Sequence, residues 1–282
     1  MNPEGTVVNP GGTVTAHPRL SVSEMCTYPW TFADELVLWD SLGLRHVGVL
    51  DVKLTAHGRD QAIRALASRS LRLTTVITNM FDLGAPETWD ATRREVNQAV
   101  ELAAVGGGCV YFTPGTAPGR SFDELTAALA DAVAPCLAHA VSQGVRLAIE
   151  PTQRTDRSFV HTLPDAIKVA DRTGLALIVD LGNCWREPDL AAAIHQVGDR
   201  LAAAQLCDVI THERAGLPTG TRVVPGEGDM PVETFLRAVL ETGYTGPFEI
   251  ELVGPAVQAE GLDVATRRAA AAATTFLEKV IP

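Results

Sequence analysis

The sequence lacks several features that mark other classes of protein. Its 282 residues carry 23 basic against 34 acidic side chains, a net charge of −11, so its surface on average repels nucleic-acid phosphates. No apolar run approaches the roughly 20 residues that a membrane span requires. The N-terminal stretch has neither the basic start nor the apolar core of a secretory signal. We therefore expect neither a nucleic-acid partner nor a membrane.

The cysteines point to a reducing compartment. There are five, an odd number, scattered along the chain without a CxxC motif, which is not the pattern of a secreted disulfide scaffold. The hydrophobic content of 46% is high enough for a substantial core and excludes disorder of the whole chain. We expect reduced thiols in a globular, cytoplasmic protein.

Eight short apolar runs recur along the chain, with amphipathic stretches between them. Most are rich in Val, Ile and Leu and do not alternate with polar residues, a pattern typical of strands buried on both faces of a parallel sheet. The predicted strands are Leu20–Ser23, His46–Leu50, Leu73–Ile77, Cys109–Phe112, Val145–Glu150, Ala176–Asp180, Ala203–Cys207 and Phe248–Leu252.

Helix boundary signals lie in the intervening stretches. Thr31 is placed to cap a helix that ends at Gly43, and Ser121 is placed to cap one that ends at Gly144. Helices are also predicted near 86–102, 163–172 and 231–242. Pro135 falls inside the helix that starts at Ser121, where its missing N–H is expected to kink or split it.

Eight strands alternating with helices in about 260 residues predict an α/β fold, a single-domain (β/α)8 TIM barrel over residues 19–282. An open doubly wound sheet is the alternative. The glycine-rich dinucleotide turn that this sheet usually has after its first strand is missing, because Ser23-Glu24-Met25-Cys26 stands there. Residues 1–18, which are rich in Gly, Pro, Thr and Val without periodicity, are expected to form a flexible tail.

Side chains with oxygen ligands follow the last four predicted strands, at the end where barrel enzymes have their active sites. Three converging carboxylates would raise one another's pKa, a conflict that a divalent cation removes. All-oxygen ligation favours Mn²⁺ or Mg²⁺, with Co²⁺ or Zn²⁺ as alternatives. Glu249 shares a strand face with Glu251, so either could face the metal; Glu251 is favoured because it is nearer the strand end. The four predicted ligands are Glu150, Asp180, Gln205 and Glu251.

The segments around these residues resemble a known family. The most specific are AIEPT at Glu150, VDLGNCWREPDL at Asp180, QLCD followed by R-x-x-PGEGDMP, and GYTGPFEIEL at Glu251. They are similar to the xylose-isomerase-like barrel superfamily, in its sugar phosphate isomerase and epimerase group, over about Leu20 to Leu277. That group includes ketohexose 3-epimerases, hydroxypyruvate isomerase, inosose dehydratase and 3-dehydroshikimate dehydratase.

The resemblance implies roles for individual residues. The four oxygen residues match the family's metal ligands, and Glu150 and Glu251 also match its proton-transferring pair. Arg222 matches an arginine that holds a substrate oxygen. Glu227, in the PGEG turn, matches a residue that lies behind the ligands.

The sequence also departs from the family pattern. Gln153 and Asn183 stand where many relatives have histidines that touch the substrate. His161, in SFVHT, is a candidate to replace one of them. Trp185 follows the sixth strand and is a candidate to stack on a sugar face. These departures leave the substrate and the reaction subtype open.

The implied activity is that of a metal-dependent isomerase or epimerase of a sugar-like hydroxyketone. One glutamate removes a proton next to a metal-bound carbonyl, which gives an enediolate, and the opposite glutamate returns a proton. The alternative is a lyase of the same superfamily, either a dehydratase of inosose or dehydroshikimate type or a β-eliminating enzyme acting on a 3-oxo-glycoside. Gln205 mildly favours the lyase.

The expected partners are one divalent ion, a small polyhydroxy ketone and further copies of the chain, with a different second subunit left open. Two other functions were weighed. DNA repair of the endonuclease IV type uses several more histidines than this sequence offers at the strand ends. A regulatory module with a vestigial site would bind no divalent ion.

Overall fold

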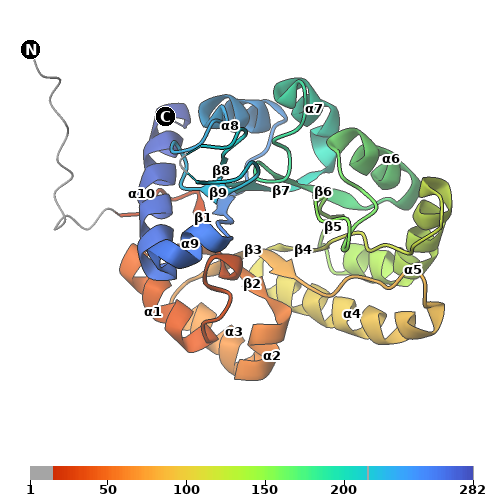
Figure 1. The fold of residues 1–282 in the computed structure, drawn as a ribbon. Coiled ribbons are helices and arrows are strands. Elements are labelled where there is room, and N and C mark those ends of the chain that lie inside the picture. The colour runs from red at the N-terminus through yellow and green to blue at the C-terminus, as the bar shows by residue number, and fades with distance from the viewer. Residues whose placement is uncertain (1–14, 215, 282) are drawn as a thin grey trace, which may run out of the picture.

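A closed parallel barrel of eight strands forms the centre of the molecule (Figure 1). The computed structural model describes residues 15–214 and 216–281. Around the barrel the strand order is β1-β10-β7-β6-β5-β4-β3-β2. This closure confirms the predicted (β/α)8 barrel and excludes an open sheet. The strands are β1 (Leu20–Ser23), β2 (His46–Leu50), β3 (Arg72–Ile77), β4 (Cys109–Phe112), β5 (Leu147–Ile149), β6 (Ala176–Asp180), β7 (Leu201–Leu206) and β10 (Phe248–Ile250).

All eight predicted strands are present, with ends shifted by no more than two residues. They read as continuous apolar runs because one face of each strand packs against helices and the other points into the barrel. The outer face contributes to the main core. The inner face contributes to a small second core in the lumen, formed by Cys109, Tyr111, Ala148, Ala176, Ile178 and Ala203.

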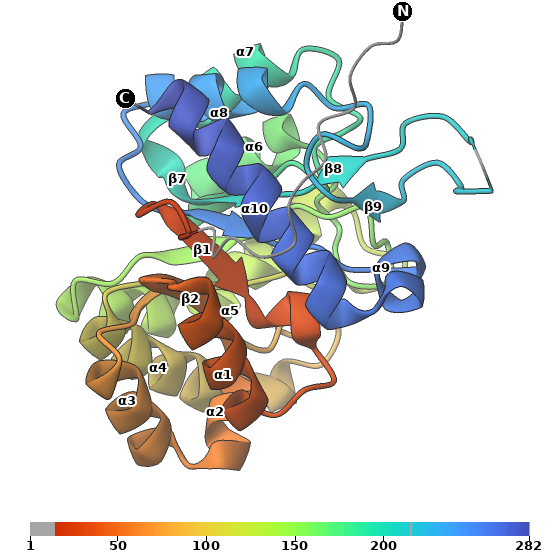
Figure 2. The same cartoon turned by 90° about the vertical axis from the view of Figure 1, so that its left-hand side faces the viewer.

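Helices cover the outside of the barrel, and the C-terminal helix α10 lies along β1 and next to α1 and α8 (Figure 2). The helices are α1 (Phe32–Leu42), α2 (Asp51–His57), α3 (Arg59–Ser68), α4 (Trp89–Gly106), α5 (Phe122–Ser142), α6 (Leu163–Thr173), α7 (Leu190–Val197), α8 (Val232–Glu241), α9 (Pro255–Glu260) and α10 (Leu262–Val280). Short 3-10 turns span Glu24–Thr27, Pro86–Thr88 and Gly198–Arg200.

Two of the predicted helix starts carry complete capping boxes. Thr31 accepts a hydrogen bond from the Asp34 N–H, and the Asp34 carboxylate accepts one from the Thr31 N–H. Ser121 and Glu124 repeat this exchange at the start of α5. Each cap satisfies N–H groups that the first helical turn leaves without partners, a contribution of about 1 kcal/mol.

Pro135 does not split α5, which runs unbroken from Phe122 to Ser142. A proline removes the hydrogen bond to the carbonyl four residues earlier, here that of Asp131. Arg93 of the neighbouring α4 supplies the missing donors: its Nη2 donates to the Asp131 oxygen and its Nε donates to the Ala132 oxygen, both at 2.9 Å. The expectation of a split helix was therefore wrong because a side chain from the next helix takes over the freed carbonyl.

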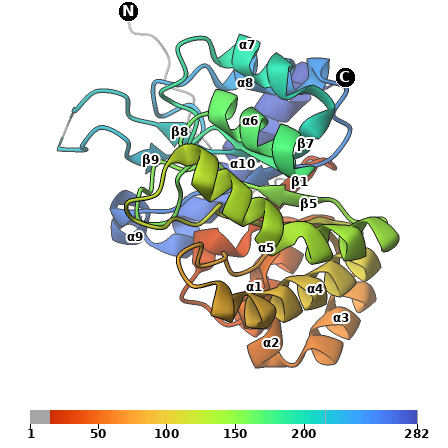
Figure 3. The same ribbon diagram turned by 90° about the vertical axis from the view of Figure 1, so that its right-hand side faces the viewer.

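By length and composition, α5 is the one helix among residues 15–214 and 216–281 that could cross a membrane, with a mean hydropathy of 1.4. It packs between α4 and α6 on the outside of the barrel (Figure 3). One side of the helix, including Leu129, Ala132 and Val133, is buried there. The core helix of a globular protein has this same composition.

A buried charged cluster attaches α1 and α2 to β1. Glu24 accepts a hydrogen bond from the Leu50 N–H, and Lys53 pairs with Glu35 at 2.5 Å. Burial, followed by the contact with Glu35, raises the pKa of Glu24 to about 10. Glu24 is therefore protonated at neutral pH. The cluster then carries one negative charge less than it would carry if all of its carboxyl groups were ionised.

The predicted tail, residues 1–18, lies mostly outside the described residues. From Ala16 the chain is tied to the barrel: the Ala16 N–H donates to the Leu42 oxygen and the His17 N–H donates to Thr274 Oγ1. These bonds connect the start of the described chain to α1 and α10.

A two-stranded hairpin follows β7 and projects from the carboxyl end of the barrel (Figure 2). Its strands are β8 (Asp208–Val209) and β9 (Arg222–Val223), which pair antiparallel. The sequence analysis predicted neither strand, because two-residue strands carry no periodicity. The hairpin matters for the site, since it brings Arg222 back to the barrel mouth.

Candidate metal centre

Three carboxylates converge at the carboxyl end of the barrel. Glu150 directly follows β5, Asp180 ends β6 and Glu251 directly follows β10. Each is at most 6% exposed. One oxygen from each lies within 4.8 Å of the others. Such a group of buried negative charges is stable only when protons, a cationic side chain or a metal ion neutralise it.

Glu249 and Glu251 both point into the lumen, at different depths. Glu251 joins the carboxylate cluster, and the Tyr111 hydroxyl donates to its Oε2. Glu249 lies one layer deeper and accepts hydrogen bonds from Ser21 and Thr75. The geometry therefore places Glu251, rather than Glu249, among the candidate ligands.

Gln205, on β7, contributes an amide to the same layer. Its Nε2 lies 2.8 Å from Glu251 Oε2 and 2.9 Å from the Tyr111 hydroxyl. Its Oε1 is buried and lacks a hydrogen-bond partner within the described part of the chain. Together with the three carboxylates, an unpaired amide oxygen on the strand beside Glu251 makes an all-oxygen donor set, which suits a hard divalent cation. The residues present therefore fit the predicted metal.

Two amide side chains organise the cluster from the loops behind it. Asn183 donates from Nδ2 to Glu150 Oε1 and to Asp180 Oδ2, both at 3.0 Å. Its Oδ1 accepts from the Thr152 hydroxyl. Gln153 donates from Nε2 to the backbone oxygens of His161 and Asn183. Asn183 thus holds two candidate ligands, and Gln153 holds the two loops together.

Arg222 supplies the positive charge in this cluster. Its Nη2 pairs with Asp180 Oδ2 at 2.6 Å, and its Nη1 donates to the Glu251 backbone oxygen at 3.0 Å. Burial alone would lower the pKa of Arg222, but the adjacent Asp180 and Glu251 carboxylates outweigh it and raise that pKa. The guanidinium therefore stays charged beside the candidate ligands.

Gly182 makes room for this arginine. A Cβ at position 182 would lie 2.6 Å from the Arg222 Cζ and 2.7 Å from the Cys207 sulfur, well inside van der Waals contact. We expect Gly182→Ala to push the guanidinium off Asp180. Because the family resemblance assigns Arg222 to a substrate oxygen, the KM for a substrate should then rise by at least about tenfold with a smaller change in kcat, since a lost charge-assisted hydrogen bond weakens binding by about 1.5–3 kcal/mol. Steady-state kinetics checks this, with Gly84→Ala as the control, because position 84 is exposed and a Cβ there would come no closer than 3.3 Å to a neighbouring atom.

Burial shifts the acidity of the cluster. Burial first, and then repulsion by Glu251 and Asp180, raises the pKa of Glu150 well above its ordinary value. Burial likewise raises the pKa of Glu251 to about 7, although Arg222 opposes the change. In the absence of a cation, burial therefore favours the protonated form of these carboxyl groups, whereas a bound metal ion would favour the ionised form.

The other predicted site residues, His161, Trp185 and Glu227, make their contacts outside the carboxylate cluster. The His161 Nδ1 lies 2.7 Å from the Thr152 backbone oxygen; a carbonyl only accepts, so Nδ1 carries the proton and Nε2 is left as an acceptor. Trp185 is half-buried, with Arg186 over its ring. Glu227 is exposed and pairs with Arg268 of α10, away from the cluster.

Asp208, which the sequence analysis missed, anchors the PGEG turn instead. Its Oδ2 accepts from the Gly226 N–H, and its Oδ1 accepts from the Met230 N–H, both at 2.9 Å. It is 1% exposed. The available signal is that Asp208 directly follows the predicted strand Ala203–Cys207, because glycine-rich turns elsewhere in the chain leave N–H groups that need an acceptor.

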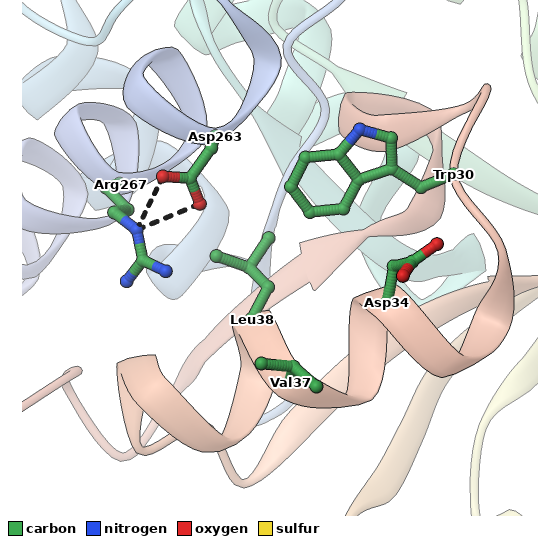
Figure 4. A pocket seen from close by; sticks show the side chains of 6 residues that line it. All are labelled: Trp30, Asp34, Val37, Leu38, Asp263 and Arg267. Atoms are coloured by element: carbon green, nitrogen blue, oxygen red, sulfur yellow. Dashed lines mark hydrogen bonds and ion pairs between the residues drawn. The ribbon is translucent and has the colours of Figure 1, made fainter.

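A surface pocket of about 340 Å³ lies between α1 and α10 (Figure 4). Its lining combines apolar side chains with an Asp263–Arg267 pair inside α10. Trp30, which follows β1, lines this pocket. The pocket is therefore separate from the carboxylate cluster at the barrel mouth.

Comparison with known proteins agrees with this geometry. The model of the xylose isomerase-like TIM barrel family matches residues 35–277. A search of curated proteins found no match. A structure described as IolI protein with a binding zinc atom has a TM-score of 0.79 at 17% identity, covering 93% of this chain and 99% of its own.

Two further solved structures share the fold. D-psicose 3-epimerase, solved in the presence of D-fructose, has a TM-score of 0.76 at 15% identity over 93% of this chain and 99% of its own. The probable 3-DHS dehydratase AsbF from Bacillus anthracis has a TM-score of 0.68 at 13% identity over 88% and 97%. The barrel and the match over most of its length confirm the resemblance seen in the motifs: the chain belongs to the xylose isomerase-like TIM barrel family.

Proposed function

We propose that the protein is a divalent-metal-dependent isomerase or epimerase of a small polyhydroxy ketone. The observation that carries the proposal is the buried cluster of Glu150, Asp180 and Glu251 beside the unpaired oxygen of Gln205. These four residues would hold one cation, Mn²⁺ or Mg²⁺, with Co²⁺ or Zn²⁺ as alternatives. When bound, the cation would polarise a ketone and acidify the neighbouring C–H.

Glu150 and Glu251 are the proposed proton carriers. One oxygen of each is held by a neutral donor, Asn183 for Glu150 and Tyr111 for Glu251. Burial raises the pKa of both carboxyl groups above the ordinary glutamate value in the metal-free protein, and a carboxylate with a raised pKa is a stronger base toward a C–H proton. Glu150 and Glu251 approach from β5 and β10, so that one can remove a proton and the other can return one.

The remaining residues would bind and orient the substrate. Arg222 presents its guanidinium beside Asp180 and Glu251 and would donate to a substrate oxygen. Gln153, Asn183, His161 and Trp185 lie in the loops after β5 and β6 and are proposed to contact the substrate at the barrel mouth. Burial of the cluster keeps water away and strengthens each of these contacts.

A dehydratase or other β-eliminating lyase is the second candidate. It shares the first proton removal and differs in the loss of a leaving group from the neighbouring carbon. Two observations support it: the AsbF dehydratase has the same fold, and Gln205, which mildly favours a lyase, stands at the third proposed ligand position.

The test is to incubate the Mn²⁺-loaded protein with a panel of ketoses, D-fructose among them, and with an inosose and 3-dehydroshikimate, in D₂O. An isomerase or epimerase incorporates deuterium next to the carbonyl, which proton NMR detects. A lyase releases water and forms a conjugated product that absorbs in the ultraviolet. Failure of every compound to exchange a proton or lose water would contradict both candidates. The homo-oligomer and the cytoplasmic location stay predictions from the sequence.

A further inference from the structure

One buried carboxylate in the barrel has no part in the proposed reaction. Glu249 is fully buried, and both of its oxygens are used. Thr75 Oγ1 lies 2.9 Å from Oε1 and 3.0 Å from Oε2, and Ser21 Oγ lies 3.2 Å from Oε2. The remaining contact joins Oε1 to Gln205 Nε2 at 3.0 Å. Glu249 therefore connects the β1 and β3 side of the lumen to a candidate metal ligand on β7.

The three strands that follow β10 around the barrel, β1, β2 and β3, leave space for this carboxylate. The inward positions next to it on β1, β2 and β3 are Ser21, Gly48 and Thr75, all small. A Cβ at Gly48 would lie only 2.1 Å from Glu249 Oε2 and 2.7 Å from Thr75 Oγ1. The glutamate side chain thus crosses the lumen into a space that exists because β2 carries a glycine there.

The position of Glu249 fixes which way the Gln205 amide faces. The Gln205 nitrogen meets the Tyr111 hydroxyl at 2.9 Å and two carboxylates, Glu249 Oε1 at 3.0 Å and Glu251 Oε2 at 2.8 Å. If the amide were turned over, its oxygen would face both carboxylates, which repel it. The NH₂ group is therefore held on that side, and Oε1 is left unpaired on the other. Glu251 is itself a proposed ligand and proton carrier. Glu249 has neither role, and the candidate ligand that it contacts is Gln205.

We propose that Glu249 is a positioning residue, which holds the Gln205 amide so that its Oε1 is presented to the metal. The inference rests on the proposed function, because it assigns Gln205 as a metal ligand. Outer partners that orient a ligand typically contribute about 10- to 100-fold to metal affinity.

The experiment is a titration of the metal-free full-length protein with Mn²⁺ alone, following free Mn²⁺ by electron paramagnetic resonance. Glu249→Met keeps the length of the side chain and removes the acceptor, so the Mn²⁺ dissociation constant should rise by about 10- to 100-fold. Glu249→Gln keeps a carbonyl oxygen that can accept from Gln205 and should bind within about threefold of the wild type. Ser21→Ala, which also loses a bond to Glu249 but leaves Gln205 untouched, is the matched control and should bind like the wild type.

The outcomes separate this inference from the proposed function. If the wild type binds Mn²⁺ and Glu249→Met binds it equally well, while losing only thermal stability, Glu249 is structural and the inference is overturned. If the wild type itself binds no Mn²⁺, the proposed function fails first and the inference fails with it. Should Glu249→Met not fold, Gly48→Ala tests the same point, because its methyl group displaces the Glu249 carboxylate; unchanged affinity in that variant also overturns the inference.

Discussion

Glu251→Gln and Glu150→Gln, made separately, are each expected to lower kcat by about 10²- to 10⁴-fold on whichever ketose the protein turns over. Glutamine preserves the shape and one oxygen of the side chain but cannot accept the substrate proton. In the proposed reaction one carboxylate serves the first step and the other serves the second, so neither residue can replace its partner. The measurement is steady-state turnover at saturating Mn²⁺, so that weaker metal binding is compensated by mass action.

The two variants also separate the two proton transfers. The variant that lacks the proton-removing group should lose deuterium exchange into the substrate, whereas the variant that lacks the returning group should keep some exchange and lose product. Glu233→Gln, the same substitution at the exposed end of α8, is the control and should leave kcat unchanged. Near-normal turnover in both active-site variants would show that the two-carboxylate scheme is wrong.

The metal-free protein is expected to lose stability as the pH rises from about 5 to about 8, and Mn²⁺ is expected to remove the part of that loss that comes from Glu251. Burial raises the pKa of Glu249 and of Glu251 to about 7, above the ordinary glutamate value that the unfolded chain has. A carboxyl group with a raised pKa in the folded state stabilises the fold at low pH, and this contribution disappears as the pH passes through the folded-state value. The loss is of the order of 3 kcal/mol for each group.

At the carboxylate cluster, a bound cation reverses the direction in which the free energy of unfolding changes with pH. A bound Mn²⁺ ion stabilises the ionised carboxylates, and at about 100 times its dissociation constant it adds about 2.7 kcal/mol to the free energy of unfolding. Urea unfolding at about pH 5.5, 7 and 8.5, with EDTA or with Mn²⁺, measures both effects. Glu251→Gln should flatten the metal-free profile because it removes one titrating group. If the free energy of unfolding of the metal-free protein rises over this pH range, the assignment is contradicted. It is also contradicted if Mn²⁺ leaves the free energy of unfolding unchanged.

The sequence predicted the barrel well because its signals are local. Runs such as His46–Leu50 and Ala176–Asp180 are apolar on both faces, and a strand between a lumen and a helix layer needs that composition. The helix starts at Thr31 and Ser121 depend on residues three positions apart. The parallel strands of a barrel all end on the same side. Residues at those ends could therefore be assigned to one common site from the sequence alone.

Contacts between distant segments could not be predicted in this way. Arg93 restores the hydrogen bonds that Pro135 removes in α5, yet the two residues lie on different helices. Asp208, rather than Glu227, holds the PGEG turn, because only the fold shows which acceptor faces its N–H groups. The depth of Glu249 in the lumen likewise depends on the register that places Gly48 and Thr75 opposite it.

The central claim is that oxygens from the last four barrel strands hold one cation. Anomalous diffraction at the manganese edge, from crystals grown with Mn²⁺, tests it most directly. The account predicts a single strong peak per chain at about 2.0–2.4 Å from one oxygen each of Glu150, Asp180, Gln205 and Glu251. The absence of an anomalous peak at the carboxyl end of the barrel at saturating Mn²⁺ would contradict this claim. A peak coordinated by other residues would also contradict it.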